Sequence, residues 1–435
     1  MELDNFDPEL EQSNTYKTCI LDLPKNLSPA QQKAYDLFTQ GKNIFISGQA
    51  GTGKSFIINM IYNYAQLHNK KINITALTGC AALLLNMKAT TIHSWGGIGI
   101  GGDVTKLISN IRKYKKVDNW LTDILVVDEV SMMSKSLFEL LDTIGKKLRK
   151  SVKPFGGIQL VFCGDFYQLP PIDDSFCFES ELWNITFDKT IIFTKNYRQQ
   201  DDGFQKVLNE VREGNISPEG CKLLLECTKK KSGEGIKPTI IYPTKRLADQ
   251  VNQFENLTLD GESHSYKSYK SNNVGHISLE LDKQIQNQKG EETITLKIGS
   301  QVMCIVNLDQ DIGVVNGSQG LVIDFHNESG TNFPIVQFKT CKMIIKPHLW
   351  KNDKYENEGI YQVPLILSWA ITIHKAQGIS LDEAMINIGS SVFEYGQTYV
   401  ALSRVRTQEG LYIKSLDISR IKANPKVIEF YKSII

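Results

Sequence analysis

The sequence is short of the features that mark membrane, secreted and zinc-binding proteins. It has no apolar run of 18 residues, so we expect no membrane-spanning helix. None of its eight cysteines forms a C-x-x-C pair, and their scatter favours reduced, buried thiols in an intracellular protein over a zinc site or a disulfide framework. The first residues are acidic and lack an apolar segment, so we expect neither a signal peptide nor a transit peptide.

Net charge is almost absent as well, because 49 basic and 48 acidic residues leave a formal charge of +1. This balance neither favours nor excludes nucleic-acid binding, which needs a local basic track rather than a basic whole. Short basic tracks do occur, and each taken singly is more typical of a solvated surface than of a binding site: 113–116, 146–150 and 229–231.

The hydrophobic pattern predicts an α/β protein of several domains, because 435 residues are too many for one core. Apolar strand patterns alternate with helical ones from residue 27 to about 194, which is typical of a parallel sheet. We predict these strands at 43–47, 73–77, 123–127, 158–162 and 190–193.

A second strand–helix rhythm starts near Asn196 and includes a strand at 239–242. Short strands and turns interrupt it at 261–362, as in a small β-barrel, and the α/β pattern resumes at 363. We therefore predict a flexible lead-in and two lobes, the second one interrupted by a β-module: 1–26, 27–194, 195–260 with 363–435, and 261–362 for the module. A glycine-rich piece at 96–102 predicts a small excursion from the first lobe.

Residues 48–55 match G-x-x-x-x-G-K-[ST] between a short apolar strand and a helical pattern. In that setting, backbone N–H groups and a helix N-terminus point at phosphate. Lys54 is expected to reach the β- and γ-phosphates, and Ser55 to hold Mg²⁺. The other predicted contacts of this loop are Gly48, Ala50, Gly51, Thr52 and Gly53. The pattern predicts binding and hydrolysis of a nucleoside triphosphate.

Two further strand ends supply polar groups for this chemistry. Asp128 and Glu129 end an apolar strand about 75 residues after the phosphate loop. Asp128 can complete the Mg²⁺ shell opposite Ser55, and Glu129 can polarise the attacking water as a general base. Gln168 follows another buried strand, where a side chain points into the ligand crevice of a parallel sheet and can sense the γ-phosphate.

Two arginines, Arg198 and Arg404, lie at the start and near the end of the second lobe. A two-lobed ATPase can place the nucleotide between its lobes and use arginines of the second lobe to stabilise charge on the transferred phosphoryl group. From spacing alone, surface salt bridges explain these two arginines equally well.

Taken together, these segments resemble a superfamily 1 DNA helicase of the petite-integration-frequency (PIF) family, in subfamily 1B and close to the RecD-like group. The resemblance covers about residues 27–415. Leu27-Ser28-x-x-Gln31 is similar to the adenine-reading Q motif, and 138–160 is similar to the segment that separates this family from RecD relatives. The other similar segments are 78–82, 91–95, 315–320, 370–378 and 399–406.

The resemblance implies two RecA-like lobes, an SH3-like barrel inserted in the second lobe and a wedge insertion at about 91–118. It implies ATP as the nucleotide, with Gln31 at the adenine, and single-stranded DNA lying across both lobes. The residues that it places on DNA are Thr78, Gly79, His93 and Ser94 in the first lobe and Thr244, Asn316, His374 and Lys375 in the second. From the residues alone, His93 and His374 could instead be hydrogen-bonded core histidines.

The resemblance also implies an ATP-dependent helicase that moves 5′-to-3′ and unwinds duplex or structured DNA in replication, repair or recombination. We expect a monomer that binds single-stranded DNA and its junctions with duplex, without a membrane. A core of this size suits a bacterial, phage or large-virus member, and hence the cytoplasm of a bacterium or an infected cell. Two alternatives stay open: a DNA-stimulated ATPase switch without strand separation, and a phosphate-loop ATPase that acts on protein.

Overall fold

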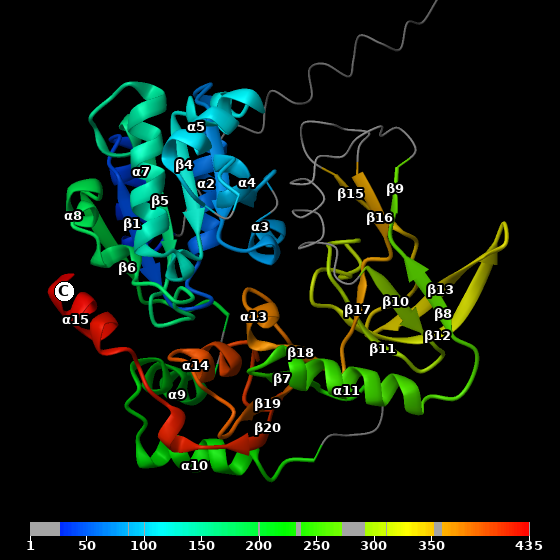
Figure 1. The fold of residues 1–435 in the computed structure, drawn as a ribbon. Helices are drawn as coiled ribbons and strands as arrows, with labels where there is room; N and C mark the ends of the chain where they lie inside the picture. The colour runs from blue at the N-terminus through cyan, green and yellow to red at the C-terminus, as the bar shows by residue number, and fades with distance from the viewer. Residues whose placement is uncertain are drawn as a thin grey trace, which may run out of the picture.

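The structure is a computed structural model of the 435-residue chain. It describes residues 27–434 with the exception of 86, 100, 199–200, 232–235, 272–291, 310 and 352–358. The predicted lead-in at 1–26 lies outside the described residues. Two α/β lobes lie one above the other, with a β-module beside them (Figure 1).

The first lobe is built on a parallel sheet with the strand order β3-β2-β4-β5-β1-β6. Each predicted strand is present within two residues of its expected bounds. The strands of this sheet are β1 (Ile44–Gly48), β2 (Ile72–Ala76), β3 (Thr90–Thr91), β4 (Ile124–Asp128), β5 (Gln159–Gly164) and β6 (Lys189–Phe193).

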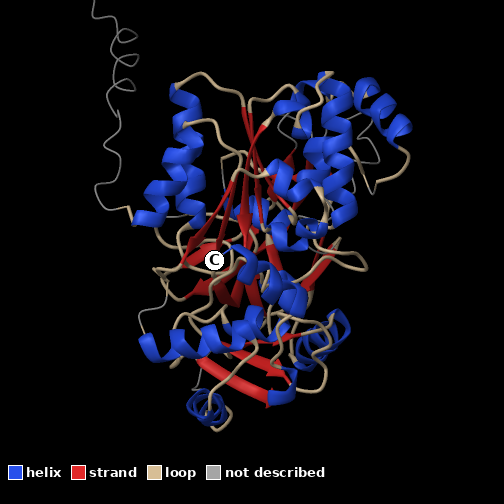
Figure 2. Cartoon of the chain, turned by 90° about the vertical axis from the view of Figure 1, so that its left-hand side faces the viewer, coloured by secondary structure: helices blue, strands red, loops and turns tan. Residues whose placement is uncertain are grey.

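Helices cover both faces of this sheet (Figure 2), because successive strand residues point to opposite faces. In β1, Ile44 and Ile46 pack on one side with Ala34 and Ile57, whereas Phe45 packs on the other side. The helices are α1 (Pro29–Thr39), α2 (Lys54–Leu67), α3 (Gly79–Leu85), α4 (Ile92–Gly96), α5 (Val104–Lys113), α6 (Val117–Trp120), α7 (Lys135–Arg149) and α8 (Leu182–Thr186), with 3₁₀ turns at Val130–Met132, Pro154–Gly157 and Cys177–Glu179.

The segment at 91–118 packs more closely than an excursion would. Trp95, Ile98 and Ile111 are buried in the same apolar cluster as Leu125 of β4. These residues therefore belong to the first lobe's core, whereas 112–115 are exposed, and the wedge at 91–118 stays a prediction.

The second lobe has a smaller parallel sheet with the order β18-β7-β19-β20. Its strands are β7 (Thr239–Tyr242), β18 (Ala370–Thr372), β19 (Ala384–Ile388) and β20 (Leu411–Leu416). Its helices are α9 (Asp202–Glu213), α10 (Pro218–Cys227), α11 (Lys245–Thr258), α13 (Ile373–Ala376) and α14 (Gln397–Leu402), with a 3₁₀ turn at Ile418–Arg420.

The β-module has antiparallel sheets and its own apolar cluster. A five-stranded sheet has the order β14-β13-β12-β11-β17, and smaller sheets pair β15-β16-β9 and β10-β8. The strands are β8 (His264–Lys267), β9 (Tyr269–Lys270), β10 (Thr293–Leu296), β11 (Gln301–Cys304), β12 (Gln319–Glu328), β13 (Thr331–Phe338), β14 (Lys342–Ile344), β15 (His348–Lys351), β16 (Gly359–Gln362) and β17 (Leu365–Leu367). The SH3-like form of this module stays a prediction.

Two predicted boundaries were wrong. The second lobe resumes at β18 rather than at 363, because β17 pairs with β11 and so belongs to the module's sheet. The final helix α15 (Pro425–Ile434) was expected in the second lobe, but Val427 and Tyr431 are buried in the first lobe's apolar cluster. Figure 1 shows this helix beside α8 and β6.

Candidate active site and nucleic-acid interface

The phosphate loop takes the shape that its glycines predict. It runs from the end of β1 to the start of α2, and Gly51 and Gly53 both have a φ of +85°. A Cβ atom at Gly51 would lie 2.5 Å from the Cβ of Arg198, so a larger residue does not fit there. The ammonium of Lys54 donates hydrogen bonds to the carbonyl oxygens of Gly48 and Gln49, at 2.6 and 2.8 Å. The loop thus presents backbone N–H groups and the N-terminus of α2 to one space.

Three strands of the first lobe end at the same edge of the sheet, which brings the predicted acids and Gln168 to the loop. In the parallel register, Ser47 of β1 lies beside Gly164 of β5, and β4 ends at Asp128. Burial, and then the neighbouring Glu129, raise the pKa of Asp128 to about 7, although Lys54 opposes this shift. Glu129 has a φ of +54°, an uncommon backbone conformation that is typical of functional positions.

Gln168 and Glu129 meet a residue of the second lobe that the sequence did not single out as a site. Gln377 is 3% exposed, and its Nε2 atom donates to Glu129 at 3.1 Å and to Gln168 at 3.4 Å. Its Oε1 atom is buried without a hydrogen-bond partner among the described residues. Gln377 directly follows α13, the helix of His374 and Lys375. Its place in the family-like segment 370–378 was the signal that could have marked it as a site residue.

Arg404 is buried and Arg198 is partly buried, and neither makes an ion pair among the described residues, so the salt-bridge alternative does not hold. Arg404 is 1% exposed and donates to the carbonyl of Val400 and the hydroxyl of Ser403. Burial, and then Arg198, lower the pKa of Arg404 to about 10. Burial also lowers the pKa of Arg198, whose Nη1 atom has no partner in the described part of the chain.

We expected Arg198 to belong to the second lobe, but it lies in a connector that precedes this lobe. The connector at 196–198 lies on the phosphate loop: Tyr197 donates its N–H to the carbonyl of Gly51 at 2.8 Å, and the Asn196 amide donates to the carbonyl of Ala50. The second lobe begins only with α9. These backbone contacts hold Arg198 against the loop.

All five predicted catalytic residues line one cavity of about 320 Å³. Residues of the first lobe, the connector and the second lobe contribute to its wall: Ala50, Gly51, Gly53, Lys54, Ser55, Ala81, Leu84, Leu85, Asp128, Glu129, Gln168, Tyr197, Arg198, Gly378 and Arg404. Three predicted nucleotide-binding residues, Gly48, Thr52 and Gln31, lie outside this wall.

Gln31 is buried behind the cavity wall at the start of α1. Its side chain completes a capping box with Ser28, and its Oε1 atom accepts a hydrogen bond from the hydroxyl of Tyr197 at 3.3 Å. Tyr197 lines the cavity and is about half exposed. Sequence reasoning missed Tyr197, although it stands next to Arg198.

The predicted DNA-binding residues come from separate elements that meet on one side of the molecule. Gly79 begins α3 and His93 and Ser94 lie in α4, both in the first lobe, whereas His374 and Lys375 lie exposed on α13. A Cβ atom at Gly378 would lie 2.7 Å from Leu84, so the turn after α13 touches α3. Figure 1 shows α3 and α13 at the junction of the lobes.

The remaining three residues belong to the same region. Thr78 precedes α3 and its hydroxyl accepts from the N–H of Ala81. Thr244 is the N-cap of α11, and since β7 and β18 are paired in parallel, α11 and α13 start at the same sheet edge. Asn316 lies in the turn before β12, where a Cβ at Gly317 would be 2.5 Å from Ile379.

The family model of PIF1-like helicases matches residues 26–221, and that of the 2B domain of DNA helicase Pif1 matches residues 285–325. The crystal structure of Pif1 helicase from Candida albicans has a TM-score of 0.80 and 34% identity, covering 94% of this chain and 100% of that one. This chain belongs to the PIF1-like helicase family.

Two other relatives bear on the PIF1-like site. The ATP-dependent DNA helicase PIF1 of Xenopus laevis is 37% identical over 431 residues, which are 95% of this chain and 66% of that protein. Pif1 helicase from Bacteroides, solved in complex with ADP-AlF3 and ssDNA, has a TM-score of 0.67 and 26% identity, covering 94% of this chain and 97% of that one. This chain spans 61–66% of the length of the four curated PIF1 relatives compared.

Within the described residues, no helix is both long and apolar enough to cross a membrane. The relatives named above come from eukaryotes and from Bacteroides, and the expected bacterial or viral host stays a prediction.

Proposed function

We propose that this chain is an ATP-dependent DNA helicase, which uses ATP bound between its lobes to move along single-stranded DNA and separate strands. One observation carries the proposal. Gln377 contacts Glu129 and Gln168 in the cavity, and it directly follows the helix that presents His374 and Lys375. One short segment, α13 and the turn that follows it, therefore connects the nucleotide site with the predicted DNA track. The names of the PIF1 relatives support the same activity.

The cavity suits a nucleoside triphosphate. The N–H groups of the phosphate loop and the ammonium of Lys54 would bind the phosphates, with Lys54 exchanging its carbonyl partners for phosphate oxygens. Tyr197, held by Gln31, would pack against the base. Because the connector carries both Tyr197 and Arg198, one segment would contact the base and the phosphates.

The donor set of the cavity fits Mg²⁺. The Ser55 hydroxyl and the Asp128 carboxylate both line it, and the described residues hold no cluster of three metal-ligating side chains. Mg²⁺ prefers such sites, because it keeps water and phosphate ligands and takes only one or two protein oxygens. Bound there, it would neutralise phosphate charge and lower the pKa of Asp128, which burial raises in its absence.

For hydrolysis, we assign the protein groups as follows. Glu129 accepts the proton of the attacking water as the new P–O bond forms and the bond to ADP breaks. Gln168 and Gln377 orient the Glu129 carboxylate and the water between the lobes. Arg404 and Arg198 stabilise the charge on the transferred phosphoryl group, and the burial of Arg404 keeps competing water away from its guanidinium.

For DNA, we propose a track over α3, α4, α13, the start of α11 and the turn at Asn316. Short hydroxyls, amides and Lys375 would bind phosphates without regard to sequence. The β-module would close over the strand from the side of Asn316, and residues 91–118 would hold the wedge. We propose 5′-to-3′ movement on the family resemblance alone.

The first experiment measures ATP hydrolysis with and without single-stranded DNA, and unwinding of duplexes that carry a 5′ or a 3′ single-stranded tail. We expect DNA to stimulate hydrolysis and only the 5′-tailed duplex to be unwound. Lys54→Ala serves as the control for contaminating ATPases.

The other outcomes separate the alternatives. Stimulated hydrolysis without unwinding of either substrate would indicate a DNA-dependent switch. If DNA did not stimulate hydrolysis, the proposal would be contradicted and a protein-directed ATPase would be favoured. Unwinding of the 3′-tailed duplex instead of the 5′-tailed one would contradict only the proposed direction of movement.

A further inference from the structure

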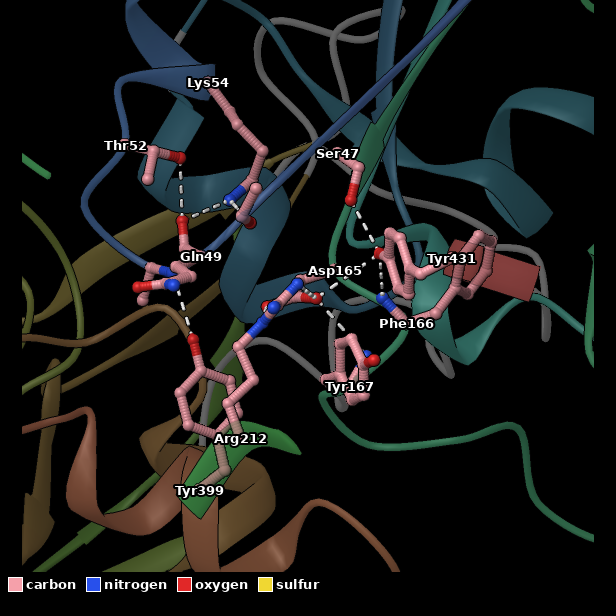
Figure 3. A network of polar contacts seen from close by, with 12 residues as sticks. Ser47, Gln49, Thr52, Lys54, Asp165, Phe166, Tyr167, Arg212, Tyr399 and Tyr431 are labelled. Carbon is pink, nitrogen blue, oxygen red and sulfur yellow. Dashed lines mark hydrogen bonds and ion pairs between the residues drawn. The ribbon is translucent and has the colours of Figure 1, made fainter. Parts of the chain in front are cut away.

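A buried ion pair joins the two lobes behind the cavity. Asp165 follows β5 and is fully buried, and its carboxylate accepts two hydrogen bonds from the guanidinium of Arg212, at 2.8 and 2.7 Å. Arg212 lies in α9 of the second lobe. Figure 3 shows Arg212 reaching Asp165 between the side chains of Tyr167 and Tyr399. The pairing keeps the pKa of Asp165 below its usual value in spite of burial.

The C-terminal helix completes this cluster with one tyrosine. The hydroxyl of Tyr431 lies 2.6 Å from the Ser47 hydroxyl, accepts from the N–H of Phe166 at 3.2 Å and donates to Asp165 at 3.4 Å. Its ring stacks on Tyr167, with ring centres 4.9 Å apart and planes 6° from parallel. The Arg212 guanidinium lies 4.2 Å from the centre of the Tyr167 ring.

The cluster of Asp165, Tyr167, Arg212 and Tyr431 holds the turn that carries Gln168. The N–H of Gln168 donates to the carbonyl of Asp165 at 2.9 Å, so the turn is anchored at its first residue. On the other side of the turn, a Cβ at Gly396 would lie 2.5 Å from the carbonyl oxygen of Gln168. This close approach presses the start of α14, the helix before Arg404, against the turn.

The cluster also reaches the phosphate loop. Ser47, which Tyr431 contacts, immediately precedes Gly48, and Tyr399 of α14 accepts a long hydrogen bond from the N–H of Ala50 at 3.5 Å. Elements of both lobes and the last helix thus converge on the loop and on the Gln168 turn. A buried ion pair is weak evidence for stability, because desolvation offsets its attraction, so its placement is better explained by geometry.

We propose that Arg212 and Tyr431 are positioning residues for ATP hydrolysis: they fix the Gln168 turn relative to the phosphate loop and transmit movement of α9 to it. This inference rests on the proposed function. Neither residue lines the cavity. Arg212 acts through Asp165, at the first position of the Gln168 turn, and Tyr431 acts through Asp165 and Ser47. The predicted signature is a change in turnover without a change in nucleotide affinity.

The experiment compares Tyr431→Phe and Arg212→Lys with the wild-type full-length chain. Tyr431→Phe keeps the stacked ring and removes only the hydroxyl, and Arg212→Lys keeps the charge but loses the paired hydrogen bonds. We expect kcat of DNA-stimulated hydrolysis to fall by ~10-fold in both, with less than about a twofold change in KM or in affinity for a fluorescent ATP analogue.

Two matched controls remove similar interactions elsewhere. Tyr266→Phe deletes a tyrosine hydroxyl that donates to the carbonyl of Asn332 in the β-module, and Lys146→Gln breaks a 2.7 Å ion pair with the buried Asp142 on α7. Melting temperatures of all four variants are measured, and rates are taken well below them. The controls should keep kcat even where they lose stability.

An unchanged kcat in Tyr431→Phe would overturn the proposal, as would a parallel loss of kcat in the controls at an equal loss of melting temperature. A fall in analogue affinity equal to the fall in kcat would also overturn it, because the cluster would then support binding rather than turnover. If the wild-type chain itself lacks DNA-stimulated hydrolysis, the proposed function fails first and this inference falls with it.

Discussion

The two lobes contribute different charged groups to the cavity, and these groups have different partners. In the first lobe, the carboxylates of Asp128 and Glu129, at the end of β4, line the cavity together with Lys54, the first residue of α2, and burial raises the pKa of Asp128. In the second lobe, Arg404 is buried, its hydrogen-bond partners among the described residues are carbonyl and hydroxyl oxygens, and the same burial lowers its pKa. Both charged forms are disfavoured by desolvation, but for opposite signs of charge.

This difference indicates which charge each side of the cavity binds. An isolated buried carboxylate is stabilised by a cation, and an isolated buried guanidinium by an anion. We infer that the first lobe holds the nucleotide and its metal in the ground state, whereas the second lobe adds positive charge as negative charge develops on the phosphoryl group.

The largest effect is expected for Lys54→Ala, which removes the cation of the phosphate loop. Both nucleotide binding and hydrolysis should fail, with turnover falling to the background of the assay, because ground-state binding and transition-state stabilisation are lost together. Isothermal titration with an ATP analogue and a hydrolysis assay check this, while the circular dichroism spectrum should stay unchanged. If more than a few per cent of the DNA-stimulated rate remained, the phosphate loop would not be the site of hydrolysis.

Arg404→Ala should reduce kcat by about 10³-fold with little loss of nucleotide affinity, because an arginine finger acts mainly in the transition state. Arg198→Ala should show the same separation of kcat from affinity, since Arg198 lines the same cavity. Steady-state kinetics with saturating DNA measure both. A rise in KM without a fall in kcat would break the comparison, because the second lobe would then contribute to ground-state binding.

Glu129→Gln should lower turnover by ~10²-fold, because it removes the general base. ATP affinity should stay the same or rise, since the substitution removes a negative charge near the phosphates. Single-turnover hydrolysis and analogue binding test this on one protein sample. Loss of binding together with hydrolysis would instead assign Glu129 to the metal or to the fold.

The smallest effect is on stability, for Asp128→Asn without divalent cations. The folded-state pKa of Asp128, about 7, lies above the value of 3.8 expected in the unfolded chain. The native state therefore binds this proton more tightly, so the wild type loses stability as pH rises from about 4 to 7. The melting temperature of Asp128→Asn should exceed that of the wild type by a few degrees at pH 8 and by less at pH 5. Glu383→Gln, at an exposed position, should show no such trend.

Much of the first lobe could be predicted because its signals are local. A strand, a glycine-rich loop and a helix are contiguous around Lys54, and alternating apolar residues place Ile44 and Phe45 on opposite faces. Arg198 and Arg404 could not be assigned in the same way. Spacing does not distinguish a surface salt bridge from a buried guanidinium, because burial depends on what packs around the side chain.

The lobe boundaries failed for a related reason. The apolar pattern of α15 shows that one face is buried, but it does not show which lobe covers that face. The sequence pattern of β17 likewise does not predict which strand it pairs with, and only the observed pairing with β11 assigns it to the β-module.

The sequence by itself determined the phosphate loop, the Asp128–Glu129 strand end, the Gln168 turn and the alternation of strands and helices, because each depends on residues close together in the chain. Only the tertiary structure decided that Gln377 contacts Glu129 across 248 positions and that Tyr431 contacts Ser47 across 384. It also decided that the connector with Tyr197 and Arg198 lies on the phosphate loop. Such contacts arise because whole helices and strands pack together, and a local pattern of residues does not specify which distant helix or strand will pack against it.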